Sequence, residues 1–154
     1  MDYQSLKNTF RLVGLKGKGA YENFHKEVPL LAIQLWSRAN EIKSHLGIEI
    51  ALFEPKTDIH HLEGNYYVGL MVNNALNTIP QGMELIELSQ QYVTTRGKIS
   101  HLNSLHFELL KWSNEQGYTR NLKSYIVEIY HPMEGREEEV RIFLPIEEKH
   151  RLKI

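Results

Sequence analysis

The feature that most constrains this chain is a repeated order of predicted elements: strand, helix, strand, strand, and then the same order once more. Trp36 and Trp112 stand 76 residues apart, each late in a predicted helix. Pro55 and Pro132 stand 77 residues apart, and each ends the strand that follows its helix. These spacings indicate an internal duplication with little sequence identity between the halves. The alternative is an ordinary α+β domain whose elements are similar by chance.

The boundaries of the predicted elements follow from apolar periodicity and from glycine and proline punctuation. Pro29 is expected in the first turn of the first helix, and Ser100 is expected to cap the second. The charged tail, residues 147–154, is expected to fray. In chain order we predict strand 8–19, helix 27–43, strands 48–55, 66–72 and 83–95, helix 100–116, and strands 125–132 and 140–146. Residues 83–95 are expected as one long strand or as two short ones around a bend.

Neither half offers enough apolar core to be stable alone, because each has only about three strands and one helix. We therefore predict a single domain over residues 1–154, with pseudo-repeat halves at about 8–72 and 83–146. The fold class is α+β, in which duplicated β-α-β-β units share one curved, mostly antiparallel sheet with two main helices on one face. The helices leave a cleft between them, and such junctions are common ligand sites.

Composition excludes several classes of function. The 154 residues carry 18 basic and 19 acidic side chains, so no basic excess indicates direct binding to nucleic acid. There is no cysteine, which excludes disulfides, thiolate zinc ligands and cysteine nucleophiles. No apolar run approaches the roughly 20 residues that cross a bilayer, and the first residues lack the apolar core of a signal peptide. We expect a cytoplasmic protein without a membrane partner.

The common catalytic and cofactor motifs do not occur. The eight histidines are scattered and no HExxH is present, so the sequence predicts no metal site. Gly14, Gly17 and Gly19 give a spacing that is neither a phosphate-binding loop nor a dinucleotide fingerprint, so we expect no cofactor. No serine lies in the GxSxG context of a nucleophile elbow.

One carboxylate occupies an unusual position. Glu128 lies at the centre of the predicted strand SYIVEIYHP, whose two faces are otherwise mostly apolar. A buried charge without a partner is costly or changes its protonation state, so Glu128 either has a partner, reaches water or lines a site. The repeat aligns it with Ala51, which indicates that the fold itself needs no acid there. The structural alternative is an internal ion pair with Arg96 or another cation.

Aromatic side chains gather on the elements that would surround the junction of the halves. They are either core residues or the lining of a pocket for a planar or cationic molecule, with a carboxylate as counter-charge. The set is Trp36, Phe53, Tyr66, Tyr67, Tyr92, Trp112, Tyr125, Tyr130 and Phe143.

Short stretches along nearly the whole chain resemble, in order, the GyrI-like small-molecule-binding domain, also called the bacterial transcription-activator effector-binding domain. No single stretch is specific, but their ordered sequence is. The stretches are FRLVGLKGKG, LWSRAN, NYYVGLMV, IPQGMELIELSQQYVTTRGKISHL, LLKWSNEQGY, SYIVEIY and IFLPI.

The resemblance implies a duplicated α+β fold with a cleft between the two helices that binds hydrophobic, often cationic, compounds. It places the central acid of the family at Glu128 and the following tyrosine at Tyr130. It also implies that Trp112, Tyr67 and Tyr92 lie at or near the cleft.

Trp36 and Phe53 complete the candidate ligand-binding set, from their place among the aromatics alone. Where the family often has a histidine and a glycine after the second-half tyrosine, this chain reads YVTTRGKISHL. Arg96 is therefore expected to change the rim of the cleft, either by repelling cations or by pairing with Glu128.

Three functions are consistent with these residues. The first is a stand-alone binder of small hydrophobic, aromatic or cationic organic molecules, acting as a sensor, a sequestering protein or a regulatory effector-binding protein. Because the two halves take up residues 8–146, we expect no DNA-binding domain within this sequence, and transcription regulation would then need a partner. The second is a hydrolase of reactive small molecules with Glu128 as general base beside Tyr130. The third is a protein interaction such as inhibition of DNA gyrase, although the near-zero net charge gives no sign of DNA mimicry.

Overall fold

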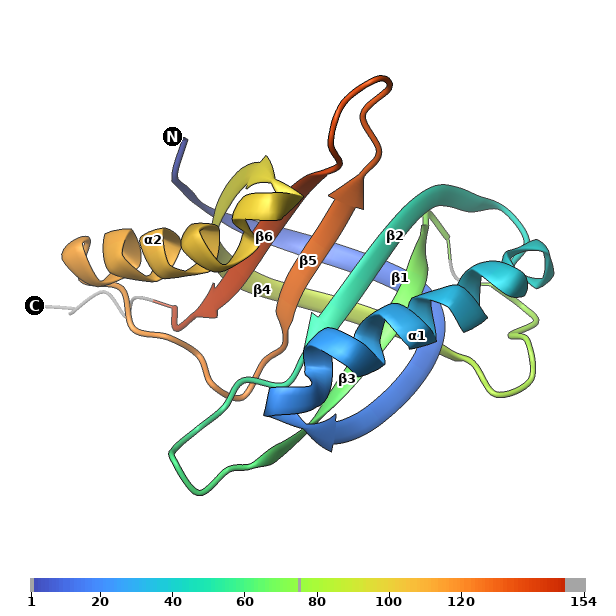
Figure 1. Cartoon of the computed structure of the whole chain (residues 1–154), viewed down its shortest axis with the longest axis horizontal. Helices are drawn as coiled ribbons and strands as arrows, with labels where there is room; N and C mark the ends of the chain where they lie inside the picture. The colour runs from blue at the N-terminus through green and yellow to red at the C-terminus, as the bar shows by residue number, and fades with distance from the viewer. Residues whose placement is uncertain (1, 75, 149–154) are drawn as a thin grey trace, which may run out of the picture.

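The six predicted strands all form, and they close into a barrel with two helices against its outside (Figure 1). The computed structural model describes residues 2–74 and 76–148. The tail that was expected to fray is residues 147–154, and residues 149–154 lie outside the described range. The elements are β1 (Gln4–Ala20), α1 (Phe24–Ser37), β2 (His45–Phe53), β3 (Glu63–Val72), β4 (Glu84–Lys98), α2 (Leu102–Glu115), β5 (Ile126–His131) and β6 (Glu139–Ile146).

The strands follow the order β1-β3-β2-β5-β6-β4 around the barrel, and each of these pairings is antiparallel. The expected α+β class with one curved antiparallel sheet is therefore confirmed, and the curvature goes as far as closure. Closure depends on the two long strands β1 and β4, each of which changes its pairing partner part of the way along its length. The first part of β1 pairs with β4 and its second part with β3, while β4 passes from β1 to β6 in the same way.

A pair of glycines allows the close approach of β1 and β3 where β1 changes partners. Gly14 lies opposite Gly69 on β3 and also opposite Glu84 on β4. A Cβ atom on Gly14 would collide with the carbonyl oxygen of Val68 and with the backbone of Gly69. Since backbone cannot move aside as a flexible side chain can, glycine is required at this point of the barrel.

Three apolar clusters stabilise the molecule, one inside the barrel and one beneath each helix. The interior cluster holds Phe10, Tyr92 and Phe143, whose rings pack edge to face. The second cluster lies between α1 and the outer faces of β1 and β3, and the third lies between α2 and the outer faces of β4 and β6. Strands therefore have apolar residues on both faces, which explains why their sequences show little alternation.

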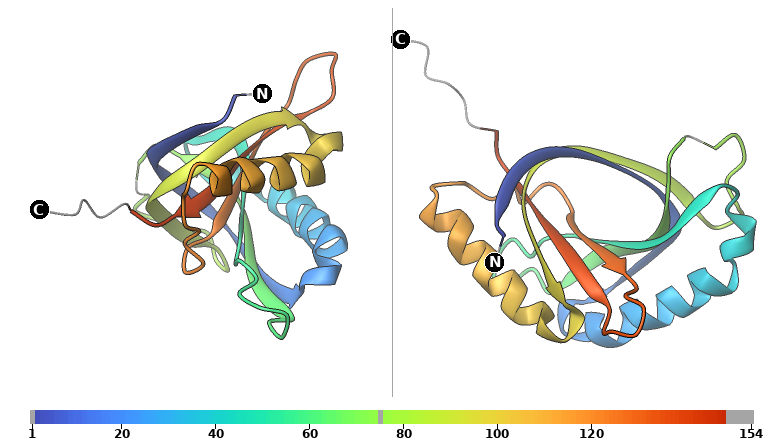
Figure 2. Two further views of the ribbon diagram at one scale, coloured as in Figure 1. Left: turned by 90° about the vertical axis from the view of Figure 1, so that its left-hand side faces the viewer. Right: turned by 90° about the horizontal axis from the view of Figure 1, so that it is seen from above.

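Both helices lie on the same side of the barrel, and β2 and β5 run between them (Figures 1 and 2). The first helix begins at Phe24 and ends at Ser37, so Pro29 lies inside it and not in its first turn. Ser100 does not cap the second helix, because it belongs to the short 3-10 turn Ile99–His101 that precedes the helix. The backbone N–H of Ser100 donates to Oε1 of Glu137. None of the helices within residues 2–74 and 76–148 is long and apolar enough to cross a membrane.

Candidate functional site

A cleft of about 730 Å³ lies between α1 and α2, with the outer faces of β2 and β5 as its floor. Phe24, Val28 and Ala32 form the α1 wall, and their spacing of four residues places them on one face of that helix. Leu102 and His106 contribute to the opposite wall with the same spacing. The volume falls within the range of small-molecule pockets, and the walls are mostly apolar.

The register between β2 and β5 determines what the floor presents. Glu49 lies opposite Tyr130, Ala51 opposite Glu128, and Phe53 opposite Ile126. Because strand side chains alternate, all six of these residues face the helices, while Ile50, Leu52, Val127 and Ile129 face the barrel interior. The floor is therefore acidic and phenolic at one end and apolar at the other.

Glu128 is buried, with 5% of its surface exposed, and both of its carboxylate oxygens accept hydrogen bonds. The hydroxyl of Tyr130 donates to Oε1 at 2.5 Å, and Nε2 of His106 donates to Oε2 at 2.7 Å. Two of the three possibilities raised by the sequence thus combine, since Glu128 lines the cleft and also has partners. Arg96 is not one of them, because it pairs with Glu139 at 3.6 Å.

Tyr130 is held as a hydrogen-bond donor. Burial, followed by the adjacent Glu128 carboxylate, raises the pKa of Tyr130 well above its usual value of about 10. The phenol therefore keeps its proton at neutral pH, and its O–H stays directed at Glu128. Glu49 and Glu138 act in the same direction on this pKa, which reflects the acidic character of this end of the cleft.

Glu49 is the second carboxylate on the floor, and Trp36 holds it in place. The indole Nε1–H of Trp36 donates to Oε1 of Glu49 at 2.7 Å. Burial raises the pKa of Glu49, the Trp36 bond lowers it, and the negative Glu138 raises it further, with a net upward shift. Folding therefore disfavours the charged form of Glu49.

This shift makes a prediction about stability and pH. A carboxyl group whose pKa is raised by folding contributes stability that is full below its unfolded value, near 4.5, and is lost as pH rises through the folded value. Glu49→Gln keeps an oxygen that can accept the Trp36 bond and removes this titration. We expect the variant to gain free energy of unfolding over the natural protein at pH 7, and the gain to disappear near pH 4. Urea denaturation at both pH values measures the difference; an equal gain at both would contradict it.

The predicted site residues separate into two groups in the structure. Glu128, Tyr130 and Phe53 line the cleft together. Trp36 lies beside it, 44% exposed, and contacts the site through Glu49.

The other three aromatic candidates lie elsewhere. Tyr67 and Tyr92 are on the opposite face of their strands, inside the barrel, where their side chains belong to the interior cluster. Trp112 stacks on Tyr3 at a centroid distance of 5.4 Å and packs near Tyr118, so it belongs to the core beneath α2.

Several lining residues were not predicted from the sequence, and His106, Glu49 and Glu138 are the ionisable ones that bear on the chemistry of the floor. His106 was treated as one of the scattered histidines, although its position four residues after Leu102 places it near the inward stripe of α2. Glu49 shares a strand face with Phe53, so the alternation of side chains along β2 could have placed Glu49 on the same face as that predicted site residue. Glu138 lies in the turn before β6, and no periodic pattern marks it.

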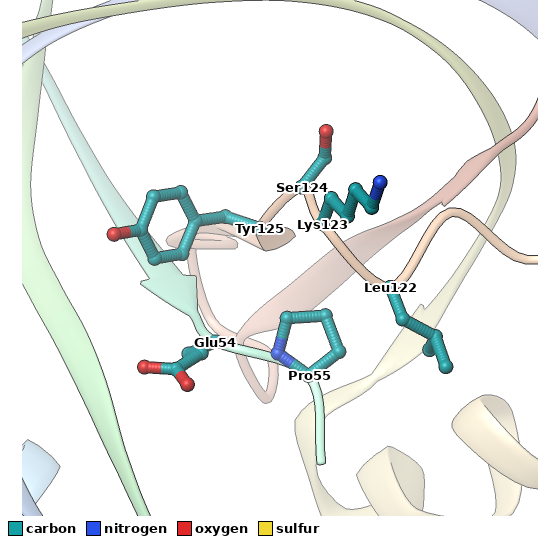
Figure 3. Close-up of a pocket in the computed structure, with 6 residues that line it drawn as sticks. All are labelled: Glu54, Pro55, Leu122, Lys123, Ser124 and Tyr125. Atoms are coloured by element: carbon teal, nitrogen blue, oxygen red, sulfur yellow. The ribbon is translucent and has the colours of Figure 1, made fainter. Parts of the chain in front are cut away.

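A second, smaller hollow of about 300 Å³ lies at the end of β2 and the segment that leads into β5 (Figure 3). It is lined by Glu54, Pro55 and residues 122–125. Oε1 of Glu54 accepts hydrogen bonds from the backbone and side chain of Asn65, and Oε2 pairs with His61 at 2.9 Å. The Asn65 backbone bond is the largest cause that lowers the pKa of Glu54. Its charge is therefore engaged in holding the loop before β3, and the larger cleft is the stronger candidate site.

No protein-family model and no curated protein matches this sequence. Solved structures do match. The structure of SAV2435 bound to tetraphenylphosphonium aligns with a TM-score of 0.71 at 14% identity, over 96% of this chain and 94% of that one. The integron cassette protein VCH_CASS2 of Vibrio cholerae aligns with a TM-score of 0.64 at 12% identity, over 94% and 95% of the two chains.

The C-terminal domain of EcmrR aligns with a TM-score of 0.57 at 15% identity, over 97% of this chain and all of that one. At such identities the likeness concerns the fold. The chain therefore has the fold that its ordered resemblance to the GyrI-like small-molecule-binding domain implied.

Proposed function

We propose that the cleft between α1 and α2 binds a small hydrophobic organic cation. The observation that carries this proposal is the combination of apolar walls with a buried carboxylate, Glu128, on the floor of a 730 Å³ cleft. Apolar burial supplies affinity at about 25 cal/mol per Å² removed from water, and the carboxylate supplies selectivity for positive charge.

Aromatic rings suit the same class of ligand. Tyr21, Phe24 and Phe53 line one end of the cleft, with the rings of Phe24 and Phe53 6.1 Å apart. Such rings stack on planar groups and attract cations through their faces. The tetraphenylphosphonium in the similarly folded SAV2435 structure supports this choice, because that ion is hydrophobic, aromatic and positively charged.

Three carboxylates line the cleft, at Glu49, Glu128 and Glu138, against the two histidines His25 and His106. At neutral pH the balance favours a cation over an anion of the same shape. Binding without chemical change is sufficient for a sensor, a sequestering protein or a regulatory effector-binding protein, and we assign this chain to that group.

Tetraphenylphosphonium and tetraphenylborate test the proposal directly, because they share size and shape and differ in the sign of their charge. We expect the cation to bind with a micromolar Kd in titration calorimetry and to raise the melting temperature by mass action. The borate should bind at least about tenfold more weakly, a difference of about 1.4 kcal/mol. Equal binding of both ions would contradict the role of the carboxylates, and binding of neither would contradict the cleft as a site.

A further inference from the structure

The two carboxylates on the floor of the cleft differ in how far their hydrogen-bonding capacity is used. Both oxygens of Glu128 accept bonds, from Tyr130 and from His106. Glu49 accepts one bond, at Oε1, from the indole of Trp36. Among residues 2–74 and 76–148, no hydrogen bond reaches Oε2 of Glu49 and no cationic side chain pairs with it. Glu49 therefore keeps acceptor capacity and an uncompensated charge inside the cleft.

The surroundings of Glu49 increase the cost of that charge. The negative charge of Glu138, which also lines the cleft, acts on Glu49. Burial and this like charge both raise the pKa of Glu49. A group that destabilises the folded state where a neutral residue would fit is a candidate for a functional role. A cation placed against Glu49 would relieve both effects.

The register fixes the relation between the two carboxylates. Glu49 lies opposite Tyr130, and Glu128 is two residues earlier on β5, so the two acids occupy diagonal positions on the same face of the sheet. Diagonal neighbours on adjacent antiparallel strands lie about 7–8 Å apart. One flat molecule of two joined rings is long enough to present a cationic group to each acid.

Trp36 gives the Glu49 position a second recognition element. Its ring is partly exposed, and the bond to Glu49 fixes its orientation at the cleft edge. A cation near Glu49 would therefore meet an indole, which has the strongest cation–π attraction among the aromatic side chains. The acid and the ring thus form one unit, which we name the Glu49–Trp36 position.

We propose that the Glu49–Trp36 position is a second cation-binding position of the cleft, so that the preferred ligand is an aromatic dication with one cationic group near Glu128 and the other near Glu49. This inference rests on the proposed function, and it narrows the ligand class from organic cations to flat dications. The charge of Glu49 is then retained because the ligand, and not the fold, compensates it.

Methyl viologen and 1-methyl-4-phenylpyridinium provide a matched pair of probes, because both are two joined rings and they differ by one positive charge. We expect titration calorimetry on the natural protein to show about tenfold tighter binding of the dication. Glu49→Gln should reduce that preference to within about twofold, because it removes the second counter-charge of the dication and so weakens the dication more than the monocation. Glu87→Gln, a surface acid outside the cleft that pairs with Arg11, serves as the control and should keep the preference.

Three outcomes decide between the possibilities. Loss of the dication preference in Glu49→Gln alone supports the proposal. Persistence of the preference in Glu49→Gln, or equal binding of both probes by the natural protein, overturns it and leaves the proposed function standing if tetraphenylphosphonium still binds. Failure of the natural protein to bind any of the three cations overturns both proposals together.

Tryptophan fluorescence gives a readout of where the dication lies. The chain has two tryptophans, and Trp112 packs against Tyr3, away from the cleft. In Trp112→Phe the remaining emission comes from Trp36, and we expect methyl viologen to quench it with the midpoint found by calorimetry. Unchanged Trp36 emission at saturating methyl viologen would overturn the placement.

Discussion

Glu128→Gln should weaken the binding of tetraphenylphosphonium by about tenfold while leaving the affinity for tetraphenylborate unchanged or improved. Two unit charges 4 Å apart interact with roughly 4 kcal/mol at an effective dielectric constant of 20. Tyr130 and His106 already share the charge of Glu128, so we expect about 1–2 kcal/mol of this to be lost with the carboxylate. Titration calorimetry on both ions measures the change.

The choice of glutamine keeps the site intact. Its amide oxygen can still accept the Tyr130 hydroxyl, and its volume matches the glutamate, so the walls of the cleft are preserved. Glu87→Gln serves again as the control, because it removes one surface charge elsewhere on the molecule. A Glu128→Gln protein that keeps its full selectivity for the cation would show that Glu128 does not provide the counter-charge.

Phe10→Ala should destabilise the protein by about 3–5 kcal/mol. Phe10 is 1% exposed, and its ring packs against Phe143 at 4.8 Å and Tyr92 at 5.4 Å between centroids. The three rings fill the barrel interior from three different strands, so truncation leaves a cavity that the closed barrel cannot collapse to fill. Urea denaturation monitored by circular dichroism measures the loss in free energy of unfolding.

Phe107→Ala provides a control with the same chemical change. Phe107 lies on α2 and is 67% exposed, so its truncation should change the free energy of unfolding by no more than about 0.5 kcal/mol. A similar loss in both variants would mean that the barrel interior is not the main source of stability. A small loss in Phe10→Ala would mean that the interior repacks.

The order and type of the elements were predictable because strand and helix periods differ and because the chain has clear turn residues. The antiparallel sheet and the position of both helices on one face followed from the need to bury each apolar stripe. Closure of the barrel was not predictable, since it depends on β1 and β4 each serving two partners. Each of these strands changes partners where it bends, at positions such as Gly14. In a sequence, a single glycine in a strand is equally consistent with a bulge or with the end of the strand.

The candidate site was predictable where a residue broke the local pattern. Glu128 stood out because an acid lay in an apolar strand. Tyr67 and Tyr92 were assigned to the cleft, but they lie inside the barrel. The error has a physical cause, because both faces of these strands are covered and the apolar pattern does not distinguish the inner face from the outer one. His106 was missed because its spacing from Leu102 indicates only which face of α2 it occupies, and not the strand residue that it meets across the cleft.

Closure of the barrel has a further consequence, for association with other proteins. Each described strand has two neighbours, so in this part of the chain no strand lies at an edge along its whole length. The long strands are nevertheless paired on one side only over part of their length: residues 4–11 of β1 pair with β4 alone, and residues 84–90 of β4 pair with β1 alone. A foreign strand could add to the sheet only along such short stretches. Where a strand is paired on both sides, a partner would have to bind through side chains, and not by extending the sheet. The apolar side chains available for this on the helices include Leu30 and Ile33 of α1 and Phe107 of α2, all more than half exposed. Ile33 also lines the cleft, so a partner that covered it would change the access of a ligand.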